Sequence, residues 1–470
     1  MTGTAAQRPA SRIVCAGCGA SPTPAEPYPF RCPNAELQPD VDHVLRRELD
    51  LARVSFPLGD DEPNPFVRYR TLLHAYHVAL GAGLRDDEFC ALVRRLDGRV
   101  ADVDGHGLVA TPYARSEELS SRLGFSAHGG VWVKDETGNV SGSHKARHLF
   151  GVLLHLEVLE LLGLVTPDAR PDLAIASCGN AALAAAVVAA AGGRRLHVFV
   201  PDDAEPSIVE RLGHLGALVE VCPRIEGEAG DPTVARLLES LAGGALPFTC
   251  QGNLNGLAVE GGETLAWEMV SANEPPLDRV VVQVGGGALA SACSHGFREA
   301  FALRAYERRP RLDTVQTKSA WPLKVAYETV VADGGTSALA YAARHRAEFM
   351  RPWASTPHSI AHGILDDETY DWLAVVEGML TTHGEPVVVG EDVLAQANEL
   401  ARDTTGIDVD PTGSAGLAGL LALRDAGRVG GDERVAVLFT GVERSHTHDE
   451  ERKDRDEKLP WSRHPVAQGL

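Results

Sequence analysis

Short runs of β-branched and apolar residues alternate with longer amphipathic stretches through most of the chain. From Val131 onward the order is DLAIAS, a helix from Asn180, LHVFVP, a helix near Ser207 to Leu215, and LVEVC. The rhythm returns with RVVVQV, a helix near Leu289 to Arg304, RLDTVQT, EPVVVG with a helix after it, and RVAVLF. This alternation is typical of βαβ units. The pattern predicts an α/β protein of two domains, each a mainly parallel twisted sheet flanked by helices.

The two ends of the chain depart from this rhythm. The first forty or so residues are rich in Pro and Ala and predict an extended arm that wraps or caps the body. From about Pro65 to Leu80, apolar positions at helical spacing predict one helix, and a second is expected near Asp87 to Leu96. Residues 446–470 are dense in charge with few apolar anchors, which is typical of a solvated tail.

Composition narrows the class of protein. Of the 470 residues, 44% are hydrophobic and 23% are charged, which excludes disorder for most of the chain. The formal net charge of −21, with no run of Lys and Arg, argues against nucleic acid and anionic membranes as partners. No apolar run is long enough to span a bilayer, and eight scattered cysteines indicate reduced thiols. We expect a cytoplasmic protein.

One group of cysteines has part of the spacing of a metal site. Cys15-Ala-Gly-Cys18 followed by Cys32 begins like a zinc ribbon, but Cys32 leads into Pro33 and Asn34, where a fourth ligand is expected. His43 completes a site only by unusual geometry. The preferred interpretation is an arm with ordinary thiols and no bound metal.

A lysine stands at the start of a long apolar stretch. Ser141-Gly142-Ser143-His144-Lys145-Ala146-Arg147 precedes a predicted helix that runs to about Leu164, with Ser141 or Ser143 as its N-cap. Lys145 then falls in the first turn, where the helix dipole disfavours an ammonium and favours the neutral amine that forms a Schiff base. A lone lysine is more often a solvated surface residue, so this interpretation depends on the other motifs.

Three predicted strands run into turns that suit a ligand. DLAIAS leads into Ser177-Cys178-Gly179-Asn180-Ala181, whose N–H groups suit a carboxylate; Asn180 either reaches a cofactor oxygen or caps the next helix. RVVVQV leads into Gly285-Gly286-Gly287-Ala288-Leu289, whose N–H groups suit a phosphate, although G-x-G-x-x-G is not matched. RVAVLF ends at Thr440, which places a hydroxyl where open parallel sheets bind ligands.

Together and in this order, these segments resemble the fold-type II pyridoxal 5′-phosphate (PLP) enzymes, the group that includes tryptophan synthase β, threonine synthase and the serine/threonine dehydratases. The resemblance extends from about Pro112 to Arg444. The blocks that support it are VWVKDETGNVSGSHKAR, ASCGNAALAAAVVAAAGG, VFVPDDAEPSIVERLGHLGALVEV, AVEGGETLAWEM, VVVQVGGGALAS, SIAHGI, IDVDPTGSAGLAGLLAL and VAVLFTG.

The resemblance implies a role for each matched residue. Lys145 carries PLP as a Schiff base, Asn180 meets the cofactor's 3′-oxygen, and Thr440 meets the pyridine nitrogen. The phosphate is held by Gly285, Gly286, Gly287, Ala288 and Leu289, and the substrate carboxylate by Ser177, Cys178, Gly179, Asn180 and Ala181. His144 resembles the His-Lys pair of tryptophan synthase β and is expected near the phosphate, with a packed histidine as the alternative. Cys178 is either a thiol activated by the helix N-terminus or a small residue that fills the turn.

The resemblance also implies a division of the chain. Residues 1–45 form the arm, 46–140 together with 255–445 a large PLP-binding domain, 141–254 a small domain, and 446–470 the tail. Family members commonly form homodimers, so a homodimer that acts on a small amino acid is expected.

The neutral Thr440 hydroxyl favours rapid loss of a β-substituent. We therefore expect a PLP-dependent lyase, similar to an ammonia-lyase or dehydratase, that acts on a hydroxy- or otherwise β-substituted L-amino acid through an aminoacrylate-type intermediate. A threonine synthase-like or β-replacement synthase is the alternative. It needs a second anion site, for which Arg147 is the nearby cation that matches the motif, whereas Ala146 stands where that branch has Asp. A nucleotide-dependent enzyme and a non-catalytic binding subunit of the same fold also stay open.

Overall fold

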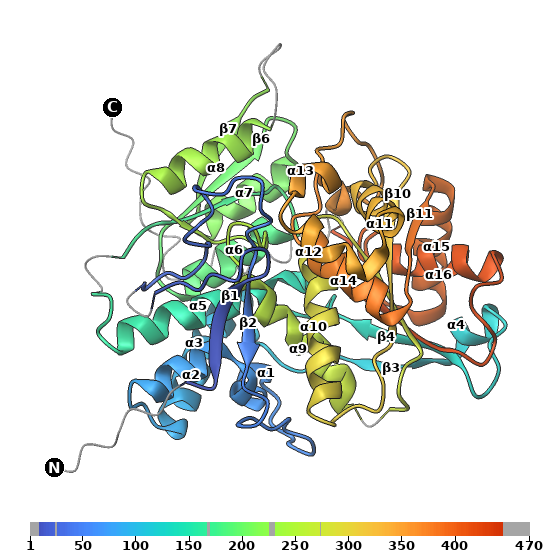
Figure 1. The fold of residues 1–470 in the computed structure, drawn as a ribbon, viewed down its shortest axis with the longest axis horizontal. Coiled ribbons are helices and arrows are strands. Elements are labelled where there is room, and N and C mark those ends of the chain that lie inside the picture. The colour runs from blue at the N-terminus through green and yellow to red at the C-terminus, as the bar shows by residue number, and fades with distance from the viewer. Residues whose placement is uncertain (1–8, 24–25, 167–169, 225–230, 273, 445–470) are drawn as a thin grey trace.

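The computed structural model describes residues 9–23, 26–166, 170–224, 231–272 and 274–444. The tail predicted for 446–470 lies outside the described residues. Strands form three sheets, and Figure 1 shows the four-stranded sheet at the upper left, the β1–β2 pair below it, and the six-stranded sheet on the right. The strands are β1 Ser11–Cys15, β2 Leu45–Leu49, β3 Tyr113–Ser116, β4 Gly130–Asp135, β5 Leu173–Ala176, β6 Leu196–Pro201, β7 Leu218–Cys222, β8 Leu246–Pro247, β9 Arg279–Gln283, β10 Arg311–Thr317, β11 Pro386–Val389 and β12 Arg434–Phe439.

The two large sheets confirm the predicted fold class. The six-stranded sheet has the order β11-β10-β9-β12-β4-β3, parallel except for β3, and the four-stranded sheet has the order β7-β6-β5-β8, parallel throughout. Strands of the second sheet all lie between residues 173 and 247, inside the range predicted for the small domain. The domain boundaries themselves stay a prediction.

Helices cover both faces of the six-stranded sheet. Along β9, Val280 and Val282 are buried in the core that includes α10 (Ala288–Ala302), whereas Val281 is buried in the core that includes α16 (Ala415–Asp425). Burial on both faces explains why this strand is a continuous apolar run. The helices are α1 Pro65–Arg68, α2 His74–Gly81, α3 Asp86–Asp104, α4 Glu117–Arg122, α5 Lys145–Leu161, α6 Asn180–Ala191, α7 Pro206–His214, α8 Pro232–Ala242, α9 Ala258–Ser271, α10 Ala288–Ala302, α11 Pro322–Ala332, α12 Leu339–Ala342, α13 Arg346–Phe349, α14 Trp372–Thr382, α15 Glu391–Thr405 and α16 Ala415–Asp425, with 3-10 turns η1 Arg70–Leu72, η2 Val140–Gly142, η4 Gly335–Ser337 and η5 His362–Ile364.

The prediction of one continuous helix from Pro65 is wrong. The segment forms α1, η1 and α2, with Leu73 extended between the last two. Asn64 caps α1 through its side-chain oxygen, which accepts from the N–H of Phe66 at 2.9 Å. The N–H of His74 donates to the carboxylate of Glu260 on α9, so a tertiary partner replaces a helical one. A distant contact therefore breaks the helix that the spacing favours.

The N-terminal region is folded rather than an extended arm. β1 pairs with β2 in an antiparallel ladder, with Ser11 opposite Leu49 and Cys15 opposite Leu45. Ile13, Cys15 and Leu45 are buried in the same core as the body. Residues 9–23 and 26–49 thus make a small module, which we call the N-terminal module, packed against α9, α10 and α14.

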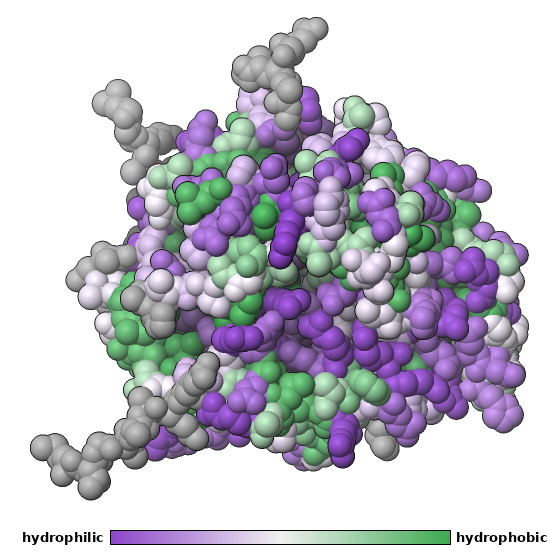
Figure 2. All heavy atoms as spheres, in the orientation of Figure 1, coloured by the Kyte–Doolittle hydropathy of each residue, from purple (hydrophilic) through white to green (hydrophobic). Residues whose placement is uncertain are grey.

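The face shown in Figure 2 gathers hydrophilic side chains across its middle and right-hand part, and its hydrophobic residues occur in separate patches. Among the helices in the described part of the chain, none is long and apolar enough to cross a bilayer.

Candidate active site

Lys145 begins α5, as predicted, and its segment is held against the end of β12. The N–H of His144 donates to the carbonyl of Thr440 at 3.2 Å, and the N–H of Val442 donates to the carbonyl of Gly142 at 2.9 Å. Gly142 has φ of 68°, in the left-handed region that glycine tolerates. Because β4 and β12 are neighbours in the sheet, these bonds place the lysine segment beside the threonine at one edge.

The predicted serine cap of α5 is wrong. The N-cap is His144, whose side chain makes no capping bond, and Ser141 lies one turn earlier with φ of 55°. The hydroxyls of Ser141 and Ser143 are buried and have no hydrogen-bond partner among the described residues. Neither hydroxyl therefore caps the helix, which the chain enters from a tight turn against the end of β12.

The glycine turn follows β9 and opens α10, with Gly287 as N-cap at φ of 96°. It is closely covered by residues 364–371: a Cβ at Gly285 would lie 2.2 Å from Oδ2 of Asp366, and one at Gly286 would lie 2.8 Å from the ring of Tyr370. The backbone therefore requires glycine here. The N–H groups and the start of a 15-residue helix make this turn suited to an oxyanion.

Asp366 already offers an anion to this turn, and the sequence did not single it out. Burial raises the pKa of its carboxyl to about 6, while nearby Lys145 and the N–H donated by Gly286 oppose that rise. The turn can thus present an N–H to a charged oxygen, which is the property that a phosphate site needs. Nothing in the run Asp366-Asp367-Glu368 distinguishes this carboxylate from its two acidic neighbours.

Thr440 is joined to the strand that carries the glycine turn. Its hydroxyl oxygen accepts from Nε2 of Gln283 on β9 at 2.7 Å, and the same nitrogen donates to the carbonyls of Gly413 at 2.8 Å and Leu438 at 3.2 Å. Because carbonyl oxygens only accept hydrogen bonds, the Gln283 amide must direct its NH₂ group toward these oxygens. The hydroxyl proton of Thr440 is left to donate to another acceptor. Gln283 is a second residue that the motifs did not indicate.

The turn from Ser177 to Ala181 brings the second sheet to the same edge. Gly179 is the N-cap of α6, and the first intrahelical bond is donated by Leu183, so the N–H groups of Asn180, Ala181 and Ala182 precede the helical ladder. Asn180 is the first helical residue, so the alternative in which Asn180 serves as the N-cap of this helix is wrong. A Cβ on Gly441 would lie 2.6 Å from Nδ2 of Asn180, so α6 directly adjoins the Thr440 turn.

Two charged residues meet the side chain of Asn180. Its Oδ1 accepts from Nη2 of Arg444 at 2.9 Å, and its Nδ2 donates to Oδ2 of Asp410 at 3.5 Å. Burial raises the pKa of the Asp410 carboxyl to about 6, opposed by the N–H of Gly413. Arg444 also donates to the carbonyl of Ser141 at 2.8 Å, so it links α6 to the lysine segment.

His144 packs against the residue that follows β12, and Cys178 has a thiol without activation. His144 is buried, its Nδ1 lies 3.2 Å from the carbonyl of Thr440, and its Nε2 has no partner among the described residues. Burial and the nearby Lys145 lower its pKa well below the usual value, so the ring is neutral. Cys178 is exposed, and partial desolvation together with Asp203 raises the pKa of its thiol. This direction is opposite to that of an activated thiol.

Arg147 does not supply the second anion site that the threonine synthase alternative needs. Its side chain is fully buried and its guanidinium is shared between Glu136, at 2.7 Å, and Glu268, at 2.5 Å. Thr111 and Thr264 accept further bonds from it. Two carboxylates already neutralise this cation, so it cannot also receive a phosphorylated substrate.

Comparisons with known proteins agree with this arrangement. The family model described as pyridoxal-phosphate dependent enzyme matches residues 106–441. Threonine synthase of Methanocaldococcus jannaschii is 25% identical over 334 residues, which cover 70% of this chain and 74% of that protein. Cysteate synthase of Methanoregula boonei is 25% identical over 334 residues, which cover 69% and 73%. The processed form of threonine deaminase isoform 2 from Solanum lycopersicum has the same fold, with a TM-score of 0.56, 16% identity, and coverage of 80% of this chain and 95% of that one.

The residue roles implied by the resemblance stay predictions, although the structure brings all four segments to one edge. The family, the fold and the cofactor are confirmed. The match covers more than half of the chain, and the glycine turn suits the cofactor's phosphate. The chain therefore belongs to the pyridoxal-phosphate dependent enzymes, in the fold-type II group.

Proposed function

We propose that the protein catalyses β-elimination on a hydroxy- or otherwise β-substituted L-amino acid, with release of a 2-oxo acid and ammonia. Bound through Lys145, PLP supplies an electron sink for the α-carbon of an amino acid. The observation that supports elimination is the bond from Gln283 to Thr440, because it leaves the neutral hydroxyl with one proton to donate. A neutral donor does not hold a proton on a pyridine nitrogen as a carboxylate does, so quick loss of a β-substituent is favoured.

The other residues of the site suit this reaction. The amine of Lys145, at the start of α5, takes the proton from the substrate α-carbon. The N–H groups at the start of α6 orient the carboxylate, with the Asn180 amide beside them. A homodimer that works in the cytoplasm on a small amino acid is the expected setting.

The test is a substrate panel monitored by absorbance and by 2-oxo acid release. The PLP-loaded enzyme receives L-serine, L-threonine and their O-phosphorylated relatives one at a time. We expect one substrate to shift the Schiff-base band and to yield a 2-oxo acid. Lys145→Ala should abolish both signals, whereas Lys324→Ala on α11, far along the chain in an i,i+4 ion pair, should keep them. Absence of a Schiff-base band in loaded wild type would contradict the proposal.

The role of Thr440 is tested separately. Thr440→Val removes the hydroxyl and keeps the volume, so elimination should slow by about 10-fold or more, while Thr440→Ser should stay close to wild type. Equal rates in the two variants would remove the main support for elimination.

A synthase is the second candidate, because the similar protein from Methanocaldococcus jannaschii is a threonine synthase. Phosphate release from an O-phosphorylated hydroxy-amino acid, with an amino acid as product and no 2-oxo acid, would favour this candidate. The involvement of Arg147 in buried ion pairs argues against it, since the phosphate then lacks that partner.

A further inference from the structure

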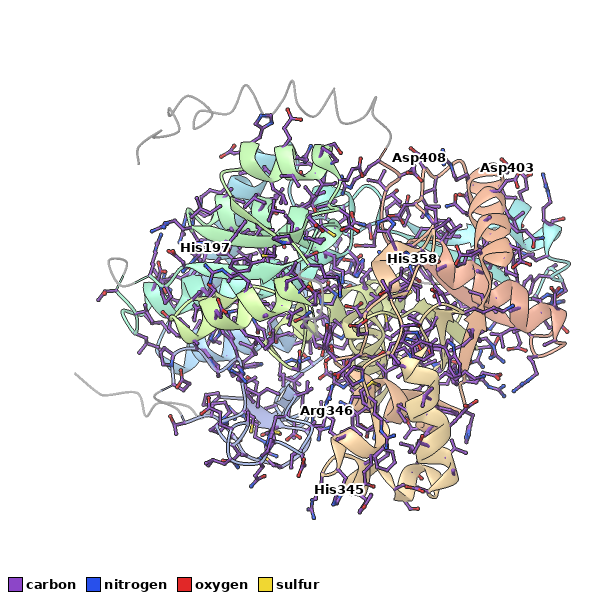
Figure 3. All side chains as sticks on the ribbon, turned by 90° about the horizontal axis from the view of Figure 1, so that it is seen from above. His197, His345, Arg346, His358, Asp403 and Asp408 are labelled. Carbon is purple, nitrogen blue, oxygen red and sulfur yellow. The ribbon has the colours of Figure 1, made fainter. Side chains whose placement is uncertain are left out.

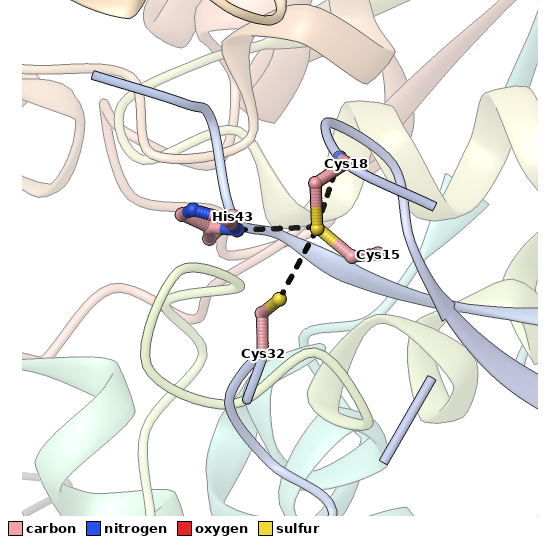
Figure 4. A group of neighbouring side chains, drawn as sticks. All are labelled: Cys15, Cys18, Cys32 and His43. Carbon is pink, nitrogen blue, oxygen red and sulfur yellow. Dashed lines mark hydrogen bonds between the residues drawn. The ribbon is translucent and has the colours of Figure 1, made fainter. Parts of the chain in front are cut away.

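Four metal-ligating side chains converge in the N-terminal module, and none of them belongs to the candidate active site. They are Cys15 at the end of β1, Cys18 in the turn after it, Cys32, and His43 just before β2, and we call them the Cys₃His cluster (Figure 4). Their ligand atoms all lie within 4.8 Å of one another. The β1–β2 register sets Cys15 opposite Leu45, which brings His43 beside the cysteines. Pairing of β1 with β2 therefore places His43 beside the cysteines, and the unusual geometry expected from the sequence is not needed.

Two of the separations are close to those of a tetrahedral zinc site, and none exceeds 4.8 Å. Two thiolates bound at about 2.3 Å lie roughly 3.8 Å apart, and a thiolate and an imidazole nitrogen lie roughly 3.6 Å apart. The sulfurs of Cys18 and Cys32 are 3.5 Å apart, and the Cys15 sulfur is 3.4 Å from Nδ1 of His43. A disulfide between Cys18 and Cys32 would need a separation of about 2.05 Å. The spacing therefore suits an ion between the ligands better than a bond between two sulfurs.

Hydrogen bonds from neighbouring groups make the same atoms suitable as metal ligands. Nε2 of His43 lies 2.9 Å from the carbonyl of Gln38, which can only accept, so Nε2 carries the proton and Nδ1 offers its lone pair to the cluster. The N–H of Cys18 donates to the Cys15 sulfur, and the N–H of Asn34 donates to the Cys32 sulfur, both at 3.4 Å. Such N–H donors stabilise negative charge on sulfur.

We propose that the Cys₃His cluster binds one Zn²⁺ ion through three thiolates and the Nδ1 of His43. On binding, the three thiols release their protons to solvent and the site carries a net charge of −1. Four protein ligands leave no open position, so the ion is structural and takes no part in the reaction. This assignment replaces the expectation of an arm without metal, and it is independent of the proposed function.

The metal would fix a segment that contacts the body next to the glycine turn. Asp42, adjacent to His43, accepts from Nε1 of Trp372 at 3.0 Å and pairs with Arg346 at 3.3 Å. Arg346 lies at the boundary between the N-terminal module and helices α12 and α13 (Figure 3), and its N–H donates to the carbonyl of Asp40 at 2.8 Å. Arg346 also pairs with Glu368, in the segment that covers Gly285 to Gly287. Zinc thus holds the module where it supports that segment.

The first experiment measures metal content of the full-length PLP-loaded enzyme after expression in zinc-supplemented medium. We expect about one zinc per chain in wild type, and less than about 0.2 in Cys18→Ser and Cys32→Ser. Cys222→Ser is the matched control, because Cys222 is 7% exposed, close to the 5% of Cys32, and lies outside the cluster on β7; it should keep the zinc. Wild type without zinc, or with a Cys18–Cys32 disulfide in non-reducing mass spectrometry, would overturn the proposal.

The second experiment does not require a ligand-deficient variant to fold. Wild type and His43→Cys are loaded with Co²⁺, whose thiolate charge-transfer absorption scales with the number of sulfur ligands. His43→Cys converts three thiolates to four, so the band should gain about one third in intensity and the ion should stay bound. A cobalt spectrum without that band, or one unchanged by His43→Cys, would contradict the ligand set.

Discussion

Two buried ionic clusters contact the same helix, α9, and differ in charge balance. The Arg147 cluster joins Lys134, Glu136, Arg147 and Glu268, with two positive and two negative groups. The Arg47 cluster joins Arg47 on β2 to Glu260, Glu263 and Glu299, with one positive group and three negative ones. The first includes Arg147, two residues after Lys145 on α5, and the second fixes the N-terminal module beside a cavity of about 240 Å³.

The imbalance changes the protonation of the glutamates. Burial raises the pKa of Glu268, but Arg147 and Lys134 outweigh it and bring the value below the usual one. In the other cluster, burial raises the pKa of Glu260 to about 8, because Arg47 is shared with Glu263 and Glu299. The pKa values of Glu263 and Glu299 are raised as well, mainly by burial. A buried carboxylate thus stays charged only where a cation is available for it.

The largest effect is expected from Arg147→Met, which leaves Glu136 and Glu268 with Lys134 alone. Removal of one partner from a buried ionic cluster costs about 3–5 kcal/mol of unfolding free energy, measured by urea denaturation. Arg170→Met is the control, because Arg170 forms a more exposed pair with Glu160 and should cost less than about 1 kcal/mol. A loss below that of the control would mean that the cluster does not stabilise the α5–α9 contact.

Arg47→Met should cost less and depend more strongly on pH. Without Arg47, three buried glutamates must be protonated in the folded state, whereas in the unfolded chain they ionise above about pH 4.3. Folding then takes up protons, so the loss grows as pH rises, by about 1.4 kcal/mol per pH unit for each proton that the folded variant holds beyond wild type. With one such proton we expect about 1 kcal/mol at pH 5.5 and about 3 kcal/mol near pH 7. The loss of unfolding free energy in Arg147→Met should change less with pH, because Lys134 remains beside Glu136 and Glu268. Equal slopes would mean that charge balance does not distinguish the clusters.

The sequence predicted the elements that depend on local pattern. RVVVQV and RVAVLF are buried on both faces, so their apolar runs identify them as strands, and the turns after them identify the active-site edge. The β1–β2 pair was missed because Leu45–Leu49, LRREL, has the polarity of a surface segment. Arg47 can be buried because Glu263 and Glu299 pair with it. These partners lie 216 and 252 residues away along the chain, so no local pattern indicates them.

The same limit applies to the candidate site. Lys145, the glycine turn and Thr440 stand in motifs that can be identified from neighbouring residues. Asp366 and Gln283 act through partners on other elements, and no local pattern distinguishes them. Arg147 was assigned by motif to a substrate anion, although Glu136 and Glu268 engage it. Tertiary partners, not residue type, decide whether a buried cation is available.

Glu260→Gln should stabilise the protein at high pH. The folded pKa of about 8 lies above the ordinary value of 4.5, so the contribution of Glu260 is fully present below pH 4.5 and is lost as pH rises through 8. Gln imitates the protonated form and does not ionise in the unfolded chain, so the gain of the variant over wild type should be roughly 3 kcal/mol larger at pH 8 than at pH 5. Glu268→Gln on the same helix has the opposite sign, because its lowered pKa gives a contribution that is present above pH 4.5 and lost in acid. Melting curves of both variants between pH 5 and pH 8 measure the difference.

The smallest effect is expected from Arg12→Ala. Arg12 pairs with Glu48 at 2.6 Å, as short as the buried contacts, and it stands on the same β1–β2 ladder as Arg47. The Arg12 side chain is 66% exposed, however, whereas that of Arg47 is 2% exposed. Water and salt screen an exposed pair, so the loss should stay within about 0.5 kcal/mol and vary little with pH. A loss equal to that of Arg47→Met would mean that contact distance, and not burial, sets the strength of these pairs, and the contrast between the two clusters would then need another cause.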